Sequence, residues 1–198
     1  MERTTEQGVL QASSGGTEVE DATFIRAAQA EPEAFGLIYQ RYVDRVYAYM
    51  RTRLASEQDA ADLTQQVFIR AFQGLPKYRS GRAPFAAWLF RIAANAATDE
   101  FRRKRAPALA LQFLPESLSP ATASAIEPEE SGRLELLREQ LADLPGRQRE
   151  LLALRFAAGL TAREIGALTG KSEAAVQKQL SRTLSTLKEH YRAQHLLP

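Results

Sequence analysis

The sequence predicts an all-α fold made of two small helical domains joined by a flexible linker. The chain has 198 residues, which is enough for one large domain or two small ones. Apolar residues recur at three- and four-residue steps, as on one face of a helix, on both sides of residues 106–130. That stretch holds four prolines among Ser, Thr and Ala, and prolines at this density forbid a long helix.

These boundaries divide the chain into four segments. Residues 1–20 are acidic and contain Gly and Ser, so we expect a disordered extension. The first domain is expected over residues 21–105, the linker over 106–130 and the second domain over 131–198. The linker contains Leu109, Leu111, Phe113 and Leu114, which are too apolar for a free tether. Our hypothesis is that it lies on the surface of another protein.

The charge alternates along the chain in the same four segments. Residues 21–105 carry 14 basic and 9 acidic residues, and residues 131–198 carry 11 basic and 7 acidic residues, for net charges of +5 and +4. The extension and the linker have net charges of −3 and −4. Cations concentrated on two folded units are typical of a bipartite protein that binds a polyanion.

The composition excludes several classes of function. The chain has no cysteine, which excludes disulfide scaffolds and Cys-based zinc or redox sites, and its two histidines lie near the end. We therefore expect no metal, no cofactor and no enzymatic activity. No apolar run approaches the roughly 20 residues of a membrane span, and the N-terminus is not a secretory signal. The prediction is a cytoplasmic protein without membrane insertion.

Three helices are predicted in the first domain. An apolar stripe runs from Phe35 to Met50. A second helix begins after Ser56, a suitable N-cap, and ends before Pro76; its predicted apolar face ends at Phe72. A third helix runs from about Pro84 to about Arg105. A polar loop containing Gly81 joins the last two helices.

The second domain is predicted to contain a helix-turn-helix. Leu134, Leu137, Leu141 and Leu144 mark one helix, and residues 148–156 a second one that Gly159 closes. Thr161 and Glu164 form a T-x-x-E capping box that begins a short helix, and Gly170 suits the left-handed position that ends it. Ser172 caps a longer, basic helix. Two helices joined by a tight glycine turn are typical of DNA-binding domains.

Several motifs together resemble the small extracytoplasmic-function (ECF, group IV) sigma factors of bacterial RNA polymerase, in the housekeeping-sigma superfamily. Asp62–Phe68 (DLTQQVF) and Trp88–Asn95 (WLFRIAAN) resemble sigma region 2. Leu144–Arg149 (LPGRQR), Gly159–Ile165 (GLTAREI) and the helix after Ser172 resemble region 4. The resemblance covers roughly residues 21–105 and 131–190, in the family's order.

The resemblance implies contacts with the polymerase core. The helix that begins after Ser56 is similar to the surface that docks on the clamp helices of the largest polymerase subunit. The residues that match this surface are Asp62, Leu63, Gln65, Gln66 and Phe68. The family usually has Glu where this chain has Gln66. The flap of the second-largest subunit and an anti-sigma protein are further partners that the resemblance implies.

The resemblance also implies two contacts with promoter DNA. The −10 element would be opened and bound as a single strand, with a base held in a protein pocket. The residues that match this surface are Tyr78, Arg79, Arg82, Phe85, Trp88, Asn95, Asp99, Arg102, Arg103, Lys104 and Arg105. The −35 element would be read in the duplex by the helix after Ser172. The residues expected there are Arg163, Ser172, Glu173, Gln177, Lys178, Ser181 and Arg182.

Plainer interpretations accompany these assignments. Trp88 and Phe85 lie at helical spacing, which is typical of core residues, and the cations from Arg102 to Arg105 also suit a solvated helix end. Asp59 and Asp62 have no accompanying base, nucleophile or metal ligand, so we interpret them as first-turn acids plus a docking contact. Two other functions are considered: an autonomous helix-turn-helix regulator, and an enzyme with a helix-turn-helix appendage. The sequence lacks the phosphate loop or catalytic pair that an enzyme needs.

Overall fold

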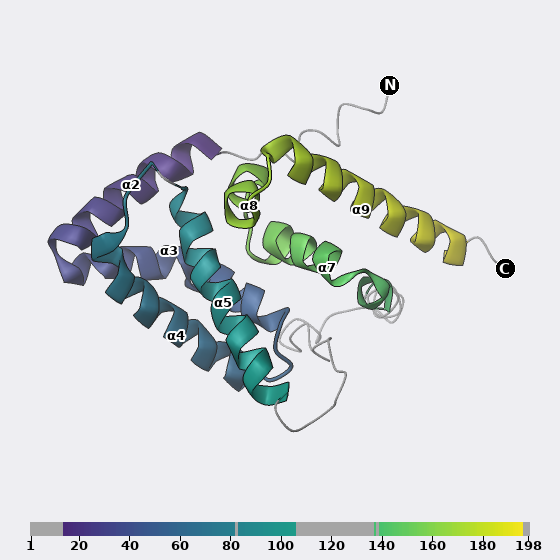
Figure 1. Ribbon diagram of the computed structural model, residues 1–198, viewed down its shortest axis with the longest axis horizontal. Coiled ribbons are helices and arrows are strands. Elements are labelled where there is room, and N and C mark those ends of the chain that lie inside the picture. The colour runs from purple at the N-terminus through teal and green to yellow at the C-terminus, as the bar shows by residue number, and fades with distance from the viewer. Residues whose placement is uncertain (1–13, 82, 106–136, 138, 196–198) are drawn as a thin grey trace, which may run out of the picture.

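The computed structural model describes residues 14–81, 83–105, 137 and 139–195 (Figure 1). Within these ranges the chain is helical and has no strand. The elements, in chain order, are α2 (Ser14–Ala30), η1 (Pro32–Ala34), α3 (Phe35–Arg51), α4 (Glu57–Gly74), η2 (Leu75–Lys77), α5 (Phe85–Arg105), α7 (Gly146–Leu152), η4 (Ala153–Ala157), α8 (Ala162–Thr169) and α9 (Glu173–His195). The prediction of an all-α chain is therefore confirmed.

Helices α3, α4 and α5 form the centre of the first domain, and α2 packs across them. Each contributes one apolar face, with Val46, Val67, Ala71, Leu89, Phe90 and Ala93 having no exposed surface. The predicted start of α4 is confirmed, because the Ser56 hydroxyl accepts a hydrogen bond from the Asp59 amide at 3.2 Å. Helix α4 packs along α5, and Gly74 at its end lies against Trp88 of α5.

Helix α2 corrects the prediction of a disordered extension over residues 1–20. It begins at Ser14, so residues 14–20 are helical, whereas residues 1–13 lie outside the described ranges. Two acids at the centre of α2 hold it to α3: Glu20 pairs with Arg41 at 2.9 Å, and Asp21 pairs with the same guanidinium at 2.9 Å. Composition alone did not predict this helix, because its stability comes from contacts with α3.

The Asp21 carboxylate is almost fully buried beside Tyr42. Tyr42 donates its hydroxyl proton to this carboxylate at 2.5 Å. Burial raises the pKa of Asp21, against the opposing effects of this hydrogen bond and of Arg41. Burial and the nearby carboxylate also raise the pKa of Tyr42, which therefore stays a hydrogen-bond donor. This buried pair anchors α2 at a single register on α3.

The helix-turn-helix of the second domain is formed by α8 and α9. The predicted capping box is present: the Thr161 hydroxyl accepts from the Glu164 amide at 3.2 Å, and Glu164 accepts from the Thr161 amide at 2.7 Å. Gly170 ends α8 in the left-handed region, at φ +72°. Ser172 caps α9 by accepting from the Ala175 amide at 3.2 Å. All three predicted signals are confirmed.

The preceding helices differ in part from the prediction. The helix expected over residues 148–156 begins earlier, at Gly146, and its last turn, η4, has the wider π-helical pattern. The helix expected from Leu134 to Leu144 is described only at residue 137 and over 139–143, which are helical. The linker with Leu109, Leu111, Phe113 and Leu114 lies outside the described residues, as do its predicted boundaries.

The two domains contact each other directly. Helix α8 packs on α5, and η4 packs on α3 (Figure 1). Helix α9 points away from the first domain and contacts α7 and α8. The side of α9 opposite α8 therefore stays open while the domains are in contact.

Gly166 makes the turn of the helix-turn-helix possible. A Cβ atom at this position would lie 2.6 Å from the backbone oxygen of Lys171, whose amide also donates to the Gly166 oxygen at 3.0 Å. Real Cβ atoms do not approach a backbone oxygen this closely. The close contact between α8 and the start of α9 therefore requires glycine.

We expect Gly166→Ala to destabilise the second domain by about 1–3 kcal/mol, because the backbone around Lys171 must shift. Urea unfolding followed by circular dichroism measures this loss. Gly36→Ala is the matched control: nothing lies within 4 Å of its added methyl group, so we expect no loss or a gain of about 0.5–1 kcal/mol. Equal stability of the two variants would contradict this role of Gly166.

Candidate nucleic-acid interface

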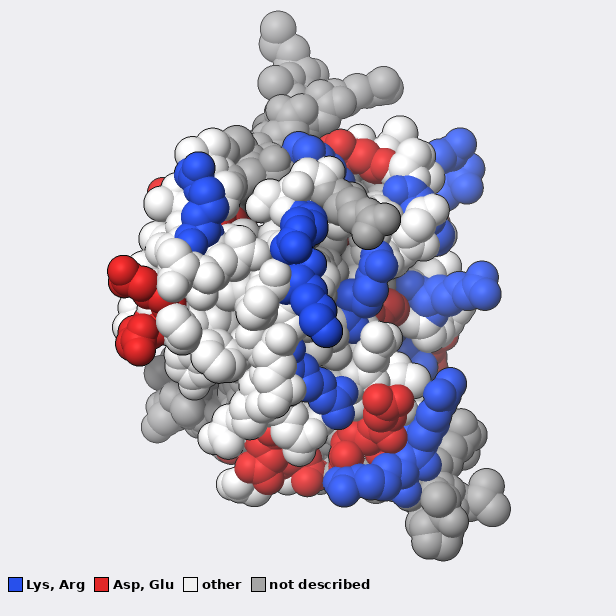
Figure 2. All heavy atoms as spheres, turned by 60° about the vertical axis from the view of Figure 1, so that its left-hand side comes forward, with Lys and Arg blue, Asp and Glu red and all other residues white. Residues whose placement is uncertain are grey.

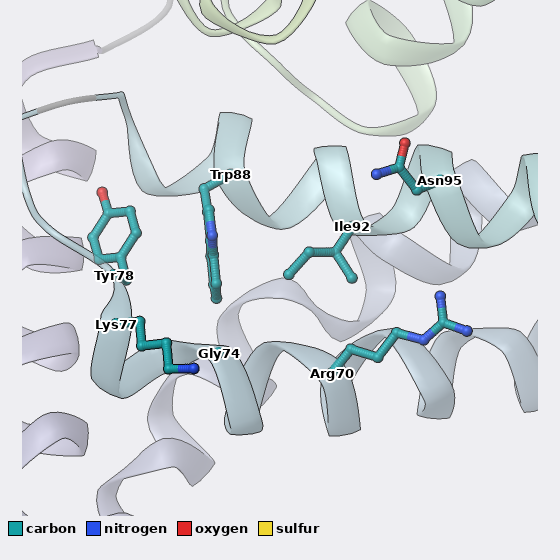
Figure 3. Close-up of a pocket in the computed structure, with 7 residues that line it drawn as sticks. All are labelled: Arg70, Gly74, Lys77, Tyr78, Trp88, Ile92 and Asn95. Atoms are coloured by element: carbon teal, nitrogen blue, oxygen red, sulfur yellow. The ribbon is translucent and has the colours of Figure 1, made fainter.

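A cavity of about 450 Å³ lies between α4 and α5, next to the loop that joins them (Figure 3). The lining residues are Arg70, Gly74, Lys77, Tyr78, Trp88, Ile92 and Asn95. Trp88 and Ile92 point from α5 toward α4 and form an apolar surface, while Arg70 and Lys77 contribute cations from the other side. An apolar floor with a cationic rim suits a nucleobase and its phosphate.

The position of the Trp88 indole depends on its neighbours. Its ring lies 5.2 Å from the ring of Tyr78 and 5.3 Å from that of Phe85, centroid to centroid. On the α4 side it packs on Gly74, where an added Cβ would lie only 3.1 Å from Cζ2 of the indole. Trp88 is half-buried, so one part of the indole packs against the protein while another borders the cavity.

The loop beside the cavity is held by hydrogen bonds to its backbone. Tyr78 donates its hydroxyl proton to the Ala83 oxygen at 2.9 Å. From α2, the side-chain amide of Gln29 donates to the backbone oxygens of Leu75 and Tyr78 at 2.9 and 3.0 Å. Because these bonds join the two ends of the loop and fix its start to α2, the loop is held in a defined position beside Trp88.

Two residues predicted to contact the −10 element lie inside the protein. Tyr78 and Phe85 have only 8% and 3% of their surface exposed, and their rings pack edge to face at 5.4 Å. Both rings belong to the aromatic cluster that packs around Trp88. For Phe85 this agrees with its plainer interpretation as a core residue. Arg79 is exposed and donates to the Pro76 oxygen at 2.9 Å, whereas Arg82 lies outside the described residues.

The other residues predicted for the −10 element follow one another along α5. Asn95, Asp99 and Arg102 are exposed. Arg103 is exposed and pairs with Glu100 at 2.8 Å, and this hydrogen bond raises its pKa. Lys104 and Arg105 belong to α5, but their side chains lie outside the described part of the chain. Of those whose side chains are described, only Asn95 lines the cavity.

Two cations that were not predicted from the sequence also lie in this region. Arg70 is exposed on α4 and lines the cavity, although it follows the polymerase motif in the sequence. Arg91 is exposed on α5, one turn after Trp88, and lines a neighbouring cleft with it. The helical spacing of Trp88 and Arg91 was the signal that could have identified the second cation.

The predicted polymerase surface on α4 divides into an exposed and a buried set. Asp62, Gln65 and Gln66 are exposed, and Asp62 accepts a hydrogen bond from Gln58 at 3.0 Å. Leu63 and Phe68, which were predicted to contact the polymerase, have only 5% and 4% of their surface exposed. They belong to the core, because they lie on the face of α4 that packs against α3 and α5.

Exposed apolar side chains lie next to these polar residues. Ile69 and Phe72 on α4 are 56% and 44% exposed, and Tyr39 on α3 is 42% exposed. Phe72 and Tyr39 were predicted to face inward; instead each lies at the edge of an aromatic cluster. Phe72 packs on Phe35 and Tyr39 packs on Phe68, at 5.1 and 4.8 Å. Partly exposed aromatic residues of this kind are typical of protein-binding surfaces.

The helix α9 presents the residues predicted for duplex DNA. Its inner face is apolar, and Val176 and Leu180 are each only 1% exposed. All the residues predicted to read the −35 element are exposed: Arg163 on α8, Ser172 at the turn, and Glu173, Gln177, Lys178, Ser181 and Arg182 on α9. Gln177 donates to Glu173 at 3.3 Å, so this amide is oriented along the helix surface.

The charges are distributed as a polyanion-binding surface requires. In Figure 2, Lys and Arg side chains run through the middle and along the right-hand side, whereas Asp and Glu gather mainly at the left edge and at the bottom. Within the described ranges, no group of three or more His, Cys, Asp or Glu residues could hold a metal ion. None of the helices that the structure describes is long and apolar enough to cross a lipid bilayer.

Two family models match the two domains. Residues 38–106 match Sigma-70 region 2, and residues 134–187 match Sigma-70, region 4. The first match contains α4, α5 and the cavity between them, and the second contains the helix-turn-helix. Both matches agree with the two parts of the chain that resemble sigma factors.

Known sigma factors share both the sequence and the fold. The chain is 32% identical over 166 residues to the ECF RNA polymerase sigma factor BldN of Streptomyces coelicolor, covering 82% of this chain and 62% of BldN. It is 31% identical over 174 residues to the ECF RNA polymerase sigma factor SigD of Mycobacterium tuberculosis, covering 85% of this chain and 82% of SigD.

Among solved structures, the sigma factor RpoE in complex with the anti-sigma factor NepR from Bartonella quintana has a TM-score of 0.60 to this chain. It is 20% identical, and the match covers 78% of this chain and 94% of RpoE, which shows a shared fold. With matches to both sigma regions and to ECF relatives over most of its length, the chain belongs to the family of ECF RNA polymerase sigma factors.

Proposed function

We propose that this sigma factor, of group IV, binds core RNA polymerase and directs it to promoters by reading two DNA elements with two domains. The second domain binds the −35 element as a duplex, and the first domain anchors the polymerase and holds the melted −10 strand. The observation that carries this proposal is the pairing of two different interfaces: a half-buried tryptophan in a cation-rimmed cavity, and an exposed polar helix after a capped turn.

The cavity suits a single strand better than a duplex. A base that leaves the duplex costs a few kcal/mol, and stacking on an aromatic ring returns about 1–3 kcal/mol. Trp88 offers the ring, while Asn95 offers an amide to a base edge and Arg70 and Lys77 offer cations to phosphates. Asp99, Arg102 and the basic end of α5 continue the surface along the strand.

The α9 surface suits the major groove. A helix of this diameter fits the groove, and the amide of Gln177 can pair with a base edge. Lys178 and Arg182 are the cations that would neutralise phosphates beside it, together with Arg163 on α8. Ser172, Glu173 and Ser181 complete the contact.

On α4, the exposed residues Asp62, Gln65 and Gln66 would contact the clamp helices of the largest polymerase subunit, next to Ile69 and Phe72. The second domain would meet the flap of the second-largest subunit. Residues 21–105 and 131–198 would act as the two units, with 106–130 as the linker between them. Two modest DNA contacts gain affinity when the polymerase holds both domains at the right separation.

An anti-sigma protein is a further proposed partner, since RpoE is described in complex with one. The exposed apolar residues of α4 offer such a protein the same surface that the polymerase needs. The protein would act in the cytoplasm, with transcription itself, and would catalyse no reaction of its own.

Run-off transcription tests the proposal. Purified sigma-free core polymerase is supplied with a promoter library, with and without this protein. The expected result is initiation at a defined set of start sites only when the protein is present. Absence of specific initiation, together with a symmetric footprint of the protein alone on duplex DNA, would instead indicate an autonomous regulator.

Lys178→Ala and Arg182→Ala should each weaken binding of the −35 duplex and reduce the slope of log affinity against log salt by about 0.9, the effect of one phosphate contact. Fluorescence anisotropy over a salt series measures both. Arg192→Ala, an exposed cation near the end of the same helix, is the control with the same change in charge. An unchanged slope in both test variants would rule out their phosphate contacts.

Asn95→Ala and Asp62→Ala should have opposite effects. The first should lower promoter opening roughly tenfold while polymerase binding stays intact, because only a base contact is lost. The second should lower polymerase affinity roughly two- to fivefold, the effect of one exposed charge contact, while −10 binding stays intact. Permanganate footprinting and polymerase titration measure the two properties. Loss of polymerase binding in Asn95→Ala would show its assignment to be wrong.

Trp88 is the single tryptophan of the chain, so the tryptophan fluorescence reports on the surroundings of this one indole. A single-stranded −10 oligonucleotide should quench this emission, because a base stacks on the indole. Gly74→Ala should shift the emission and weaken the quenching, since the added methyl group displaces the indole. Gly36→Ala should behave as wild type. Full quenching in the Gly74 variant would show that the base does not use this side of Trp88.

A further inference from the structure

The contact between the two domains is held by polar side chains of the first domain. Arg45 on α3 donates to the oxygens of Ala158 and Gly159 at 2.7 and 3.2 Å. Arg91 on α5 donates to the Ala167 oxygen at 2.9 Å. A third contact is made by Glu150 on α7, which accepts from Tyr49 at 2.9 Å and pairs with Arg53.

Two of these contacts join a guanidinium to a helix end. Ala158 and Gly159 follow the last turn of η4, and Ala167 lies in the last turn of α8. Carbonyl oxygens at the C-terminal end of a helix accept no hydrogen bond from an N–H group of the same helix. They also lie at the negative end of the helix dipole. They attract a guanidinium, yet water can replace it at little cost, so the contact is suited to open and close.

A cleft of about 530 Å³ lies where the domains meet. Lys77, Tyr78, Arg79, Ala83, Trp88 and Arg91 line it from the first domain, and Ala167 lines it from α8. Among the described residues that line it, three are cations and none is acidic. Trp88 borders both this cleft and the cavity between α4 and α5. The cleft therefore continues the proposed single-strand surface, and Ala167 of α8 borders it from the second domain.

We infer that Arg91 exchanges partners: in the closed protein it holds the Ala167 oxygen, and in the open protein it binds a phosphate of the single DNA strand that passes Trp88. This inference rests on the proposed −10 function of the Trp88 cavity and deepens it. Because the guanidinium that holds Ala167 is the one that would hold the phosphate, closure of the domains and this contact with the strand exclude one another.

The exchange has a physical basis in the charge of the two acceptors. A carbonyl oxygen carries a partial charge, whereas a phosphate carries a full one, so the phosphate makes the stronger bond to a guanidinium. The affinity of the free protein for the strand is reduced by the fraction of molecules that are open. Any partner that separates the domains, as the polymerase is proposed to do, raises this fraction.

Arg45 allows a sharp test, because it holds the domains together but lines neither the cavity nor the cleft. Arg45→Ala should raise the affinity of the full chain for a single-stranded −10 oligonucleotide about five- to tenfold, since more molecules are open. Arg91→Ala loses both partners, so the lost phosphate contact offsets the gain from opening: its affinity should stay below that of Arg45→Ala, and the salt slope should decrease by about 0.7. Arg26→Ala, the control, removes an exposed arginine of α2 that donates to the Ala22 oxygen of its own helix at 3.2 Å, and should behave as wild type.

The opening itself can be measured because the chain has no cysteine. Gln73→Cys on α4 and Ser185→Cys on α9 place one exposed spin label on each domain. Double electron–electron resonance should show one short distance for wild type, and longer distances for Arg45→Ala or after the oligonucleotide is added. Glu150→Ala removes the third contact from the second domain and should give the same longer distances. Agreement between the two variants would show that the longer distances do not come from misfolding of one of them.

Three results would overturn the inference. These are a wild-type protein that is already open, an Arg45→Ala protein that stays closed, and an open Arg45→Ala protein whose affinity for the strand equals that of wild type. The last result leaves the proposed −10 function intact if the strand still quenches Trp88. A wrong proposed function would be recognised separately, because neither the quenching of Trp88 nor promoter-specific run-off transcription would then be observed.

Discussion

Small side chains along α5 allow this helix to lie close to its neighbours on several sides. Ala86, Ala87 and Ala93 have no exposed surface, and the helix contacts α2, α3, α4 and α8. Because alanine keeps the helix axes near one another, the larger Trp88 and Ile92 are left to fill the space beside α4. The same helix presents Arg91 to the second domain and Asn95 to the cavity. The contact of Arg91 with the second domain and the cavity beside Asn95 therefore both depend on how closely α5 packs against its neighbours.

Local signals predicted much of this structure correctly. The caps at Ser56, Thr161 and Ser172 each depend on a side chain and a backbone amide three residues away, so they are visible in the sequence. The left-handed turn at Gly170 is also a local property. The recognition helix followed directly from them, and its predicted residues are all exposed.

Features that depend on tertiary contacts were predicted less well. Helix α2 was missed because its central residues are held by Arg41 and Tyr42, which lie on another helix. Phe85 and Phe68 were placed on binding surfaces, although the way the helices meet buries both. Periodicity identifies an apolar face but not its edges, where Tyr39 and Phe72 are exposed. The cations Arg70 and Arg91 acquire their significance only from the cavities beside them.

The attachment of α2 to the loop after α4 changes what counts as part of the first domain. The match to the region 2 family begins at residue 38, within α3, and leaves α2 out. Yet Ile25 and Ala28 of α2 are buried, and the Gln29 amide holds the backbone at Leu75 and Tyr78. Natural variants upstream of the aligned segment would look peripheral in a comparison of family members. At Gln29, such variation would act on the loop beside Trp88 from a position outside the segment that the region 2 family model matches.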